Sequence, residues 1–201
     1  MGCMLSAASC NKWLMEDIFQ VDDYAAEQAD ISEEKLGRNT VFFLPYLMGE
    51  RSPINDTDAR GTFIGMRMDT KRKDMILAVL EGVAFAIRDN FEIAKLQGIN
   101  ITSSSLCGGG AKSELWQKIL CNVLGIEITL LQTEQGPGYG AAMLAMVADG
   151  AFCDVKECAD KFVKHRKTVK PDMCISSRYD ERYGKYKEIY PALKNVFKTI
   201  K

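Results

Sequence analysis

The sequence contains a single histidine, and this scarcity excludes the chemistry that depends on that residue. His165 lies among Lys164, Arg166 and Lys167. A Ser-His-Asp relay needs a histidine held by a carboxylate, and a histidine-based metal site needs several ligands in register. We therefore exclude both as the basis of this protein's function.

Long apolar runs and paired cysteines are also lacking. No stretch reaches the ~20 apolar residues that cross a bilayer, and Met1 to Leu5 lacks the basic region and apolar core of a secretory signal. The seven cysteines are odd in number and form no Cys-x-x-Cys pair. We expect a soluble, cytoplasmic protein without a membrane partner. Its cysteines should be reduced and mostly buried, with Cys107, Cys121 and Cys158 inside strand or helix patterns.

Charge of one sign is not in excess overall, but it is unevenly distributed. Residues 161–201 hold 12 Lys and Arg against four Asp and Glu, whereas the whole chain has a net charge of −1. A basic segment could bind nucleic acid, but here it contains no compact basic run and no nucleic-acid motif. We interpret it as a solvated face that balances an acidic body, and expect no nucleic-acid partner.

Three consecutive glycines, Gly108 to Gly110, are the most informative feature that is present. They follow a short strand pattern that ends near Leu106, and they precede a helix pattern with Ser113 as N-cap and Gly125 as stop. Without Cβ atoms, such a turn lets a ligand approach the backbone closely. The following helix N-terminus suits phosphate or ribose oxygens.

Two better-known nucleotide motifs do not fit this turn. A Walker A loop needs a glycine where Ala111 stands, and its first glycine would fall on Leu106. A dinucleotide fingerprint needs a glycine at Ser113. Taken alone, the turn favours an ordinary tight connection between a strand and a helix.

The remaining patterns alternate between strands and helices, which favours an α/β fold with helices packed on a sheet. We predict helices over residues 4–19, 22–36, Thr70 to Gly98 and Gln135 to Ala145, strands over 40–47, 61–66 and 126–131, and a helical, basic remainder from Gly150.

We expect Glu81, beside the apolar stripe of the longest helix, to have a hydrogen-bonded structural role. We expect Tyr179, Tyr183, Tyr186 and Tyr190 to dock a C-terminal helix on the body. The composition of the long polar loop over 49–61 is equally consistent with a functional loop and with an ordinary solvated loop.

Several separate motifs occur in the order typical of one enzyme family. They are Met4 to Cys10, Phe43 to Pro53, Asp58 to Gly61, a signature from Gly61 through Phe63 and Gly65 to Glu81, Gly108 to Ser113, and the Tyr179 to Tyr183 tail. On these motifs the chain resembles the C-terminal half of the FGGY carbohydrate kinases. Within that family it is most similar to the members that phosphorylate D-xylulose.

The resemblance implies an α/β, actin-like ATPase (ribonuclease H-like) domain that is incomplete at its N-terminal strands. We expect this domain over residues 1–160, with a helical extension over 161–201 packed on it. It also implies that ATP, with Mg²⁺, binds here and that the domain closes over a sugar. Gly109, Gly110, Ala111 and Glu114 would contact the nucleotide, Gly61 would approach its phosphates, and Arg60 would order that loop.

The resemblance leaves two hypotheses open, because the family's catalytic aspartate and sugar-binding residues lie upstream of the matching region. No catalytic residue is assigned in this chain. In the first hypothesis, the chain is the nucleotide-binding part of a sugar kinase and needs a missing N-terminal kinase domain. In the second, it is a noncatalytic nucleotide-binding or dimerising module, with a homodimer as one form. Gluconate, ribulose and glycerol stay open as alternative substrates.

Overall fold

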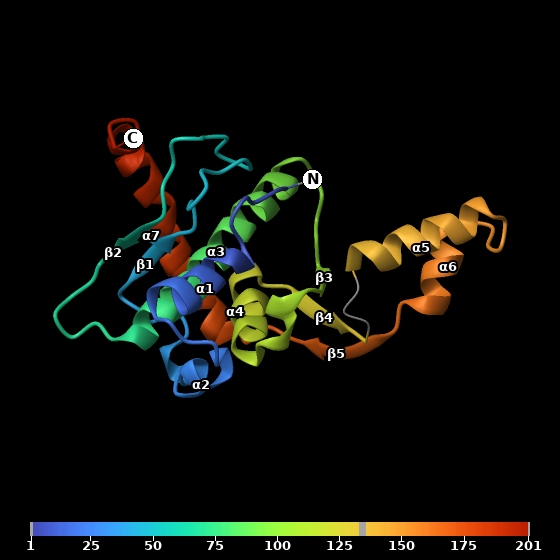
Figure 1. Cartoon of the computed structure of the whole chain (residues 1–201), viewed down its shortest axis with the longest axis horizontal. Helices are drawn as coiled ribbons and strands as arrows, with labels where there is room; N and C mark the ends of the chain where they lie inside the picture. The colour runs from blue at the N-terminus through green and yellow to red at the C-terminus, as the bar shows by residue number, and fades with distance from the viewer. Residues whose placement is uncertain (1, 133–135, 201) are drawn as a thin grey trace.

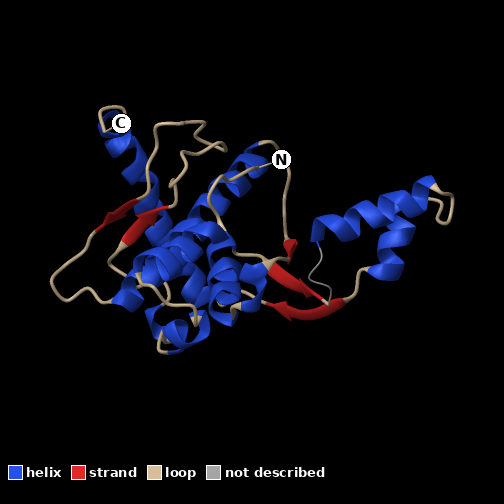
Figure 2. Cartoon of the chain, in the orientation of Figure 1, coloured by secondary structure: helices blue, strands red, loops and turns tan. Residues whose placement is uncertain are grey.

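The computed structural model describes residues 2–132 and 136–200 and shows a mixed α/β protein (Figures 1 and 2). The elements are α1 (Ala8–Lys12), a π-helix η1 (Trp13–Ile18), α2 (Tyr24–Ala29), η2 (Glu33–Lys35), β1 (Phe42–Leu44), β2 (Thr62–Ile64), α3 (Arg72–Leu96), β3 (Ser103–Leu106), η3 (Gly109–Lys112), α4 (Glu114–Leu124), β4 (Glu127–Leu131), α5 (Gly136–Ala148), α6 (Val155–Phe162), β5 (His165–Val169) and α7 (Met173–Phe197). One sheet pairs β1 with β2, and the other has the order β3-β4-β5. β3 runs parallel to β4, and β5 runs antiparallel to it.

Helix α3 forms the centre of the core. Its predicted apolar stripe is buried, with Ile76, Val79 and Val83 fully inaccessible to solvent. Thr70 is the N-cap that the sequence suggests, but Lys71 is the N-cap in the structure, so the helix begins one residue later, at Arg72. The Asp74 carboxylate accepts the Lys71 backbone N–H at 2.9 Å, whereas the Thr70 hydroxyl accepts the N–H of Arg67.

The C-terminal helix α7 packs on this core, as its tyrosine stripe predicts. Tyr179, Tyr183 and Tyr186 are buried, and their rings surround Phe85 of α3 at centroid distances of 5.1–6.0 Å. Glu81 also has the expected structural role, because it forms a buried ion pair with Arg182 of α7. A second ion pair, between Arg88 of α3 and Asp180 of α7 at 2.7 Å, joins the same helices, so aromatic packing and ion pairs together fix α7 to the body.

The prediction that the chain is helical throughout from Gly150 is wrong at β5. This strand reads His-Arg-Lys-Thr-Val and is exposed along most of its length. It lies at one edge of its sheet, so it lacks the alternation of apolar and polar residues that a half-buried strand shows. The division of the chain into a domain over 1–160 and an extension stays a prediction.

Helices α5 and α6 extend away from the body on the far side of the β3-β4-β5 sheet (Figure 1). None of the described residues of α5 is buried, although its sequence has no charged side chain. The predicted start of this helix, Gln135, lies outside the described residues. Among residues 2–132 and 136–200, no helix combines the length and apolar character needed to cross a membrane.

The cysteines are free, but the prediction that most of them are buried is wrong. Cys10, Cys121 and Cys158 are buried, Cys3 is half-buried, and Cys107, Cys153 and Cys174 are exposed. Burial raises the pKa of the Cys10 thiol to about 12 and that of Cys121 to about 11. Cys107 is exposed because β3 ends one residue before it, at the start of the glycine turn.

Candidate functional site

The glycine turn has the predicted order of strand, turn and helix. β3 ends at Leu106, and Gly108 has a φ of +84°, a conformation that favours glycine. One turn of 3₁₀ helix follows, closed by a hydrogen bond from the Ala111 N–H to the Gly108 carbonyl at 3.0 Å. Ser113 then caps α4 by accepting the Trp116 N–H at 3.1 Å.

The glycines of the turn differ in what surrounds them. A Cβ on Gly109 would meet nothing within 4 Å, so the backbone there faces open space. A Cβ on Gly110 would lie 2.7 Å from the Trp116 ring. That ring is itself held in place, because its Nε1 donates to the Leu80 carbonyl at 3.2 Å. Gly110 is therefore required by the indole behind it, whereas Gly109 is available to a ligand.

A pocket of about 600 Å³ opens beside Gly109 and Gly110. Its other walls come from α1 and α2, and most of its lining surface is apolar, although many of the lining residues also carry polar groups. The remaining lining residues are Ala8, Ser9, Asn11, Lys12, Tyr24, Ala25, Gln28, Lys112, Ser113 and Trp116. The Ser113 hydroxyl donates to the Gln28 side chain at 2.6 Å and thereby ties the turn to α2. A concave site of this size with a largely apolar surface suits a flat heterocycle.

A second, smaller pocket of about 300 Å³ lies beside the same turn and includes Gly108 and Ala111. Arg166 of β5 contributes a cation to its lining. Nearby, Lys167 forms an ion pair with Glu114 at 3.1 Å, and this contact holds the pKa of the Glu114 carboxyl below its usual range. The unpredicted strand β5 therefore places positive charge close to the first turn of α4.

The structure brings only part of the predicted set of residues together. Gly109 and Gly110 line the larger pocket, Ala111 lines the smaller one, and Glu114 is exposed at the start of α4. Arg60 and Gly61 line neither pocket. The Arg60 Nη1 donates to the carbonyls of Thr57 and Ala59, both at 2.9 Å, so it bonds within its own loop. Whether any of these residues binds a nucleotide stays a prediction.

Several lining residues were not foreseen from the sequence. Lys12 of α1 and Tyr24 and Gln28 of α2 are far from the glycine turn along the chain. Their helices were predicted, and Ala8 and Ser9 fall within the motif Met4 to Cys10. Nothing in their spacing, however, indicates that they face Gly109.

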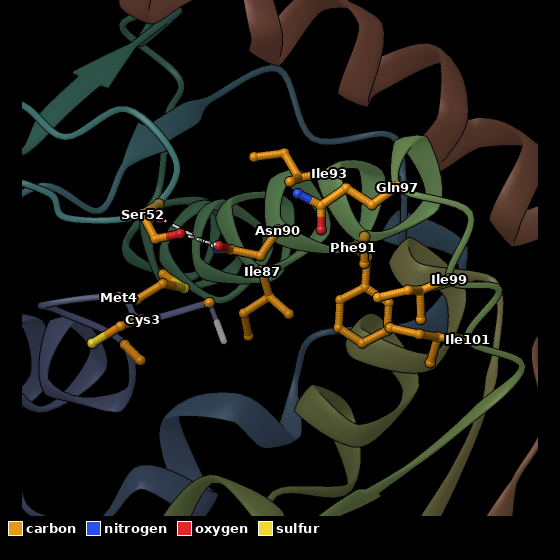
Figure 3. Close-up of a pocket in the computed structure, with 13 residues that line it drawn as sticks. Cys3, Met4, Ser52, Ile87, Asn90, Phe91, Ile93, Gln97, Ile99 and Ile101 are labelled. Atoms are coloured by element: carbon orange, nitrogen blue, oxygen red, sulfur yellow. Dashed lines mark hydrogen bonds between the residues drawn. The ribbon is translucent and has the colours of Figure 1, made fainter.

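A larger pocket, of about 800 Å³, lies elsewhere, beside the N-terminal residues (Figure 3). It is lined by Gly2, Cys3, Met4, Ala7, Ser52, Ile87, Asn90, Phe91, Ile93, Ala94, Gln97, Ile99 and Ile101. At one side the Ser52 hydroxyl donates to Asn90 Oδ1 at 2.5 Å, and at the other Phe91, Ile99 and Ile101 form an apolar wall. It contains no cluster of ionisable side chains, so it suits an apolar segment better than a charged substrate.

Comparison with known proteins gives consistent matches. The model of the FGGY family of carbohydrate kinases, C-terminal domain, matches residues 1–148. The xylulose kinase of Staphylococcus xylosus is 35% identical over 190 residues, which cover 94% of this chain and 39% of that protein.

Solved structures agree in fold. The crystal structure of a xyloylose kinase from Brucella ovis has a TM-score of 0.87 at 36% identity and covers 98% of this chain and 40% of that one. Gluconate kinase from Lactobacillus acidophilus has a TM-score of 0.86 at 26% identity, over 100% of this chain and 41% of that one. The predicted actin-like α/β fold is therefore confirmed, and the chain spans about 40% of the length of the relatives it matches.

Proposed function

The chain belongs to the FGGY family of carbohydrate kinases, and from this membership we propose that it forms the ATP-binding part of a sugar kinase. We propose D-xylulose as the sugar and D-xylulose 5-phosphate as the product, because relatives named xylulose kinase match it at up to 36% identity. The gluconate kinase neighbour supports gluconate as the alternative substrate.

The observation that carries this proposal is the pocket beside Gly109 and Gly110. Its apolar walls from α1, α2 and Trp116 would hold the adenine ring, and the open backbone at Gly109 would admit it. Lys12 and Lys112 are the two lysines that line that pocket, and the long, flexible side chain of a lysine suits contact with a phosphate or ribose oxygen. Arg166 in the smaller pocket is a second candidate for a phosphate contact.

The Mg²⁺ that kinases use needs carboxylate or phosphate oxygens. Within the described parts of the chain, no three His, Cys, Asp or Glu side chains gather as a metal site. We therefore propose that Mg²⁺ arrives with the nucleotide's phosphates and that these residues do not form a separate cage for it. A bound Mg²⁺ would neutralise phosphate charge during transfer.

Phosphoryl transfer also needs a carboxylate that accepts the proton of the sugar hydroxyl. We propose that this base and the sugar site are supplied by polypeptide corresponding to the part of the relatives that the chain does not cover. Three surfaces are suited to receive it. One is the unburied apolar helix α5, the second is the outer edge of β3, and the third is the apolar pocket of Figure 3.

The experiment that tests this function is a coupled assay for ADP release. The chain is joined to the N-terminal part of the Staphylococcus xylosus xylulose kinase, and ATP is added with D-xylulose, gluconate, ribulose or glycerol in turn. The proposal predicts turnover that depends on D-xylulose. Because the sugar site of the joined protein comes from the Staphylococcus xylosus part, the assay tests whether this chain supports phosphoryl transfer from ATP and not which sugar it prefers. A joined protein that binds ATP but phosphorylates none of these sugars contradicts a sugar kinase.

A further inference from the structure

A basic pocket of about 560 Å³ lies between the segment Gly37–Phe42 and α7, and it shares no lining residue with either pocket of the glycine turn. Four cationic residues line it, namely Arg38, Arg178, Arg182 and Lys185. Among its described lining residues the only carboxylate is Glu181, which accepts from Lys185 at 2.6 Å. The pocket therefore has an excess of positive charge.

The geometry of α7 concentrates this charge on one side of the helix. Arg178, Arg182 and Lys185 are spaced by four and three residues, so they share a face. The opposite wall approaches closely, because Gly37 has a φ of +72° and a Cβ there would lie 2.6 Å from the Arg178 Cβ. Arg178 also bonds this wall, since its Nη1 donates to the Leu36 carbonyl at 3.3 Å. The two walls are thus held together by specific contacts.

Arg182 is the fixed part of the pocket. Its side chain is only 7% exposed, and its Nη2 donates to Glu81 and to the Val41 carbonyl. Its guanidinium lies over the Phe42 ring at 4.2 Å from the ring centroid. The Nε–H, however, is buried and has no acceptor among residues 2–132 and 136–200. This Nε–H is shielded from solvent, so the donors that reach a ligand in the pocket are those of Arg38 and Arg178.

We propose that this pocket binds a phosphate group, either free or carried by a small molecule. Arg38 is exposed and Arg178 uses one nitrogen on Leu36, so their guanidinium groups keep N–H donors for the oxygens. Arg182 and Lys185 are already paired with Glu81 and Glu181, so the attraction for an anion depends on Arg38 and Arg178. A phosphate held from both walls links α7 to the segment Gly37–Thr40 and stabilises the docked helix.

The test is a titration of the chain with inorganic phosphate at constant ionic strength, followed by NMR signals of the arginine side chains and by the thermal unfolding midpoint. We expect signals of Arg38, Arg178 and Arg182 to shift and the midpoint to rise. Arg38→Gln combined with Arg178→Gln should weaken phosphate binding at least about tenfold. Lys187→Gln combined with Lys194→Gln is the matched control, because it removes two positive charges from α7 outside the pocket and should leave binding unchanged.

Three results would overturn the proposal. In the first, phosphate shifts signals only at the glycine turn; in the second, the double variant binds phosphate as the wild type does. In the third, acetate binds as tightly as phosphate. If Arg178→Gln fails to fold, the exposed Arg38→Gln variant decides alone, and unchanged affinity in it contradicts the pocket. If a phosphate monoester shifts the same arginine signals as inorganic phosphate does, the pocket binds a phosphate group carried by a small molecule. If only inorganic phosphate shifts them, the pocket binds the free ion.

Discussion

Arg182 of α7 donates from Nη2 to Glu81 of α3 at 2.9 Å, with both side chains buried. The pair joins the two 25-residue helices of the protein. Burial raises the pKa of the Glu81 carboxyl, and the nearby guanidinium opposes that shift. The ionised pair depends on both partners being present.

Removing one partner of this pair should therefore destabilise the fold. Arg182→Met leaves a buried carboxylate without its cation, and we expect a loss of about 3 kcal/mol in the free energy of unfolding. The double variant Glu81→Met with Arg182→Met should recover most of that loss. Urea unfolding of the wild type, the two single variants Glu81→Met and Arg182→Met, and the double variant measures the coupling. Additive single effects would show that the pair is not coupled.

The two adjacent glycines of the turn form a matched pair for a second prediction. Gly110→Ala places a methyl group against Trp116 and should cost about 1–3 kcal/mol of stability through overpacking. Gly109→Ala meets open space and should change stability by no more than about 1 kcal/mol. Equal effects in thermal unfolding would contradict the position of the indole ring.

The buried carboxyl of Asp89 should make the stability of the α3–α7 contact depend on pH. Burial raises the pKa of its carboxyl to about 6, although the Tyr183 hydroxyl donates to it at 2.6 Å. The protonated form is thus favoured in the folded state. The protonated Asp89 carboxyl stabilises the fold fully below pH ~4, the pKa of an aspartate in the unfolded chain. This contribution is lost as the pH rises through 6.

Asp89→Asn removes this titration. We expect the free energy of unfolding of the wild type, relative to this variant, to fall by roughly 2 kcal/mol between pH 4 and pH 7. Urea unfolding at several pH values provides the measurement. A constant difference across this range would show that the Asp89 pKa is not raised.

Cysteine labelling reports on the glycine turn. Cys107 lies one residue after β3 and lines the smaller pocket, and it is exposed together with Cys153 and Cys174. All three should react rapidly with a thiol reagent in the folded protein, whereas buried Cys10 should not. If a nucleotide binds at the turn, ATP should slow the labelling of Cys107 and leave Cys153 unaffected. Equal protection of both thiols would indicate an indirect effect.

How far the sequence predicts this protein depends on whether a feature is local. The turn from Leu106 to Ser113 was predictable, because glycine, N-cap and strand signals are adjacent in the chain. The α7 docking face was predictable from its tyrosine spacing. β5 was not, because a charged edge strand carries no apolar alternation. The far wall of the site was not predictable either, since Ser113 and Gln28 meet across 85 residues of sequence.

The proposed nucleotide site places an adenine nucleotide against Gly109. Gly109→Leu fills the space that a ligand would use, while the neighbouring structure leaves room for the side chain. Calorimetry with Mg-ATP, on the chain and on the protein joined to the N-terminal part of a relative, measures this directly. We predict heat of binding from the wild type and at least about tenfold weaker affinity in the variant. No heat from either wild-type protein, or equal affinity in the Gly109→Leu variant, would contradict the nucleotide site.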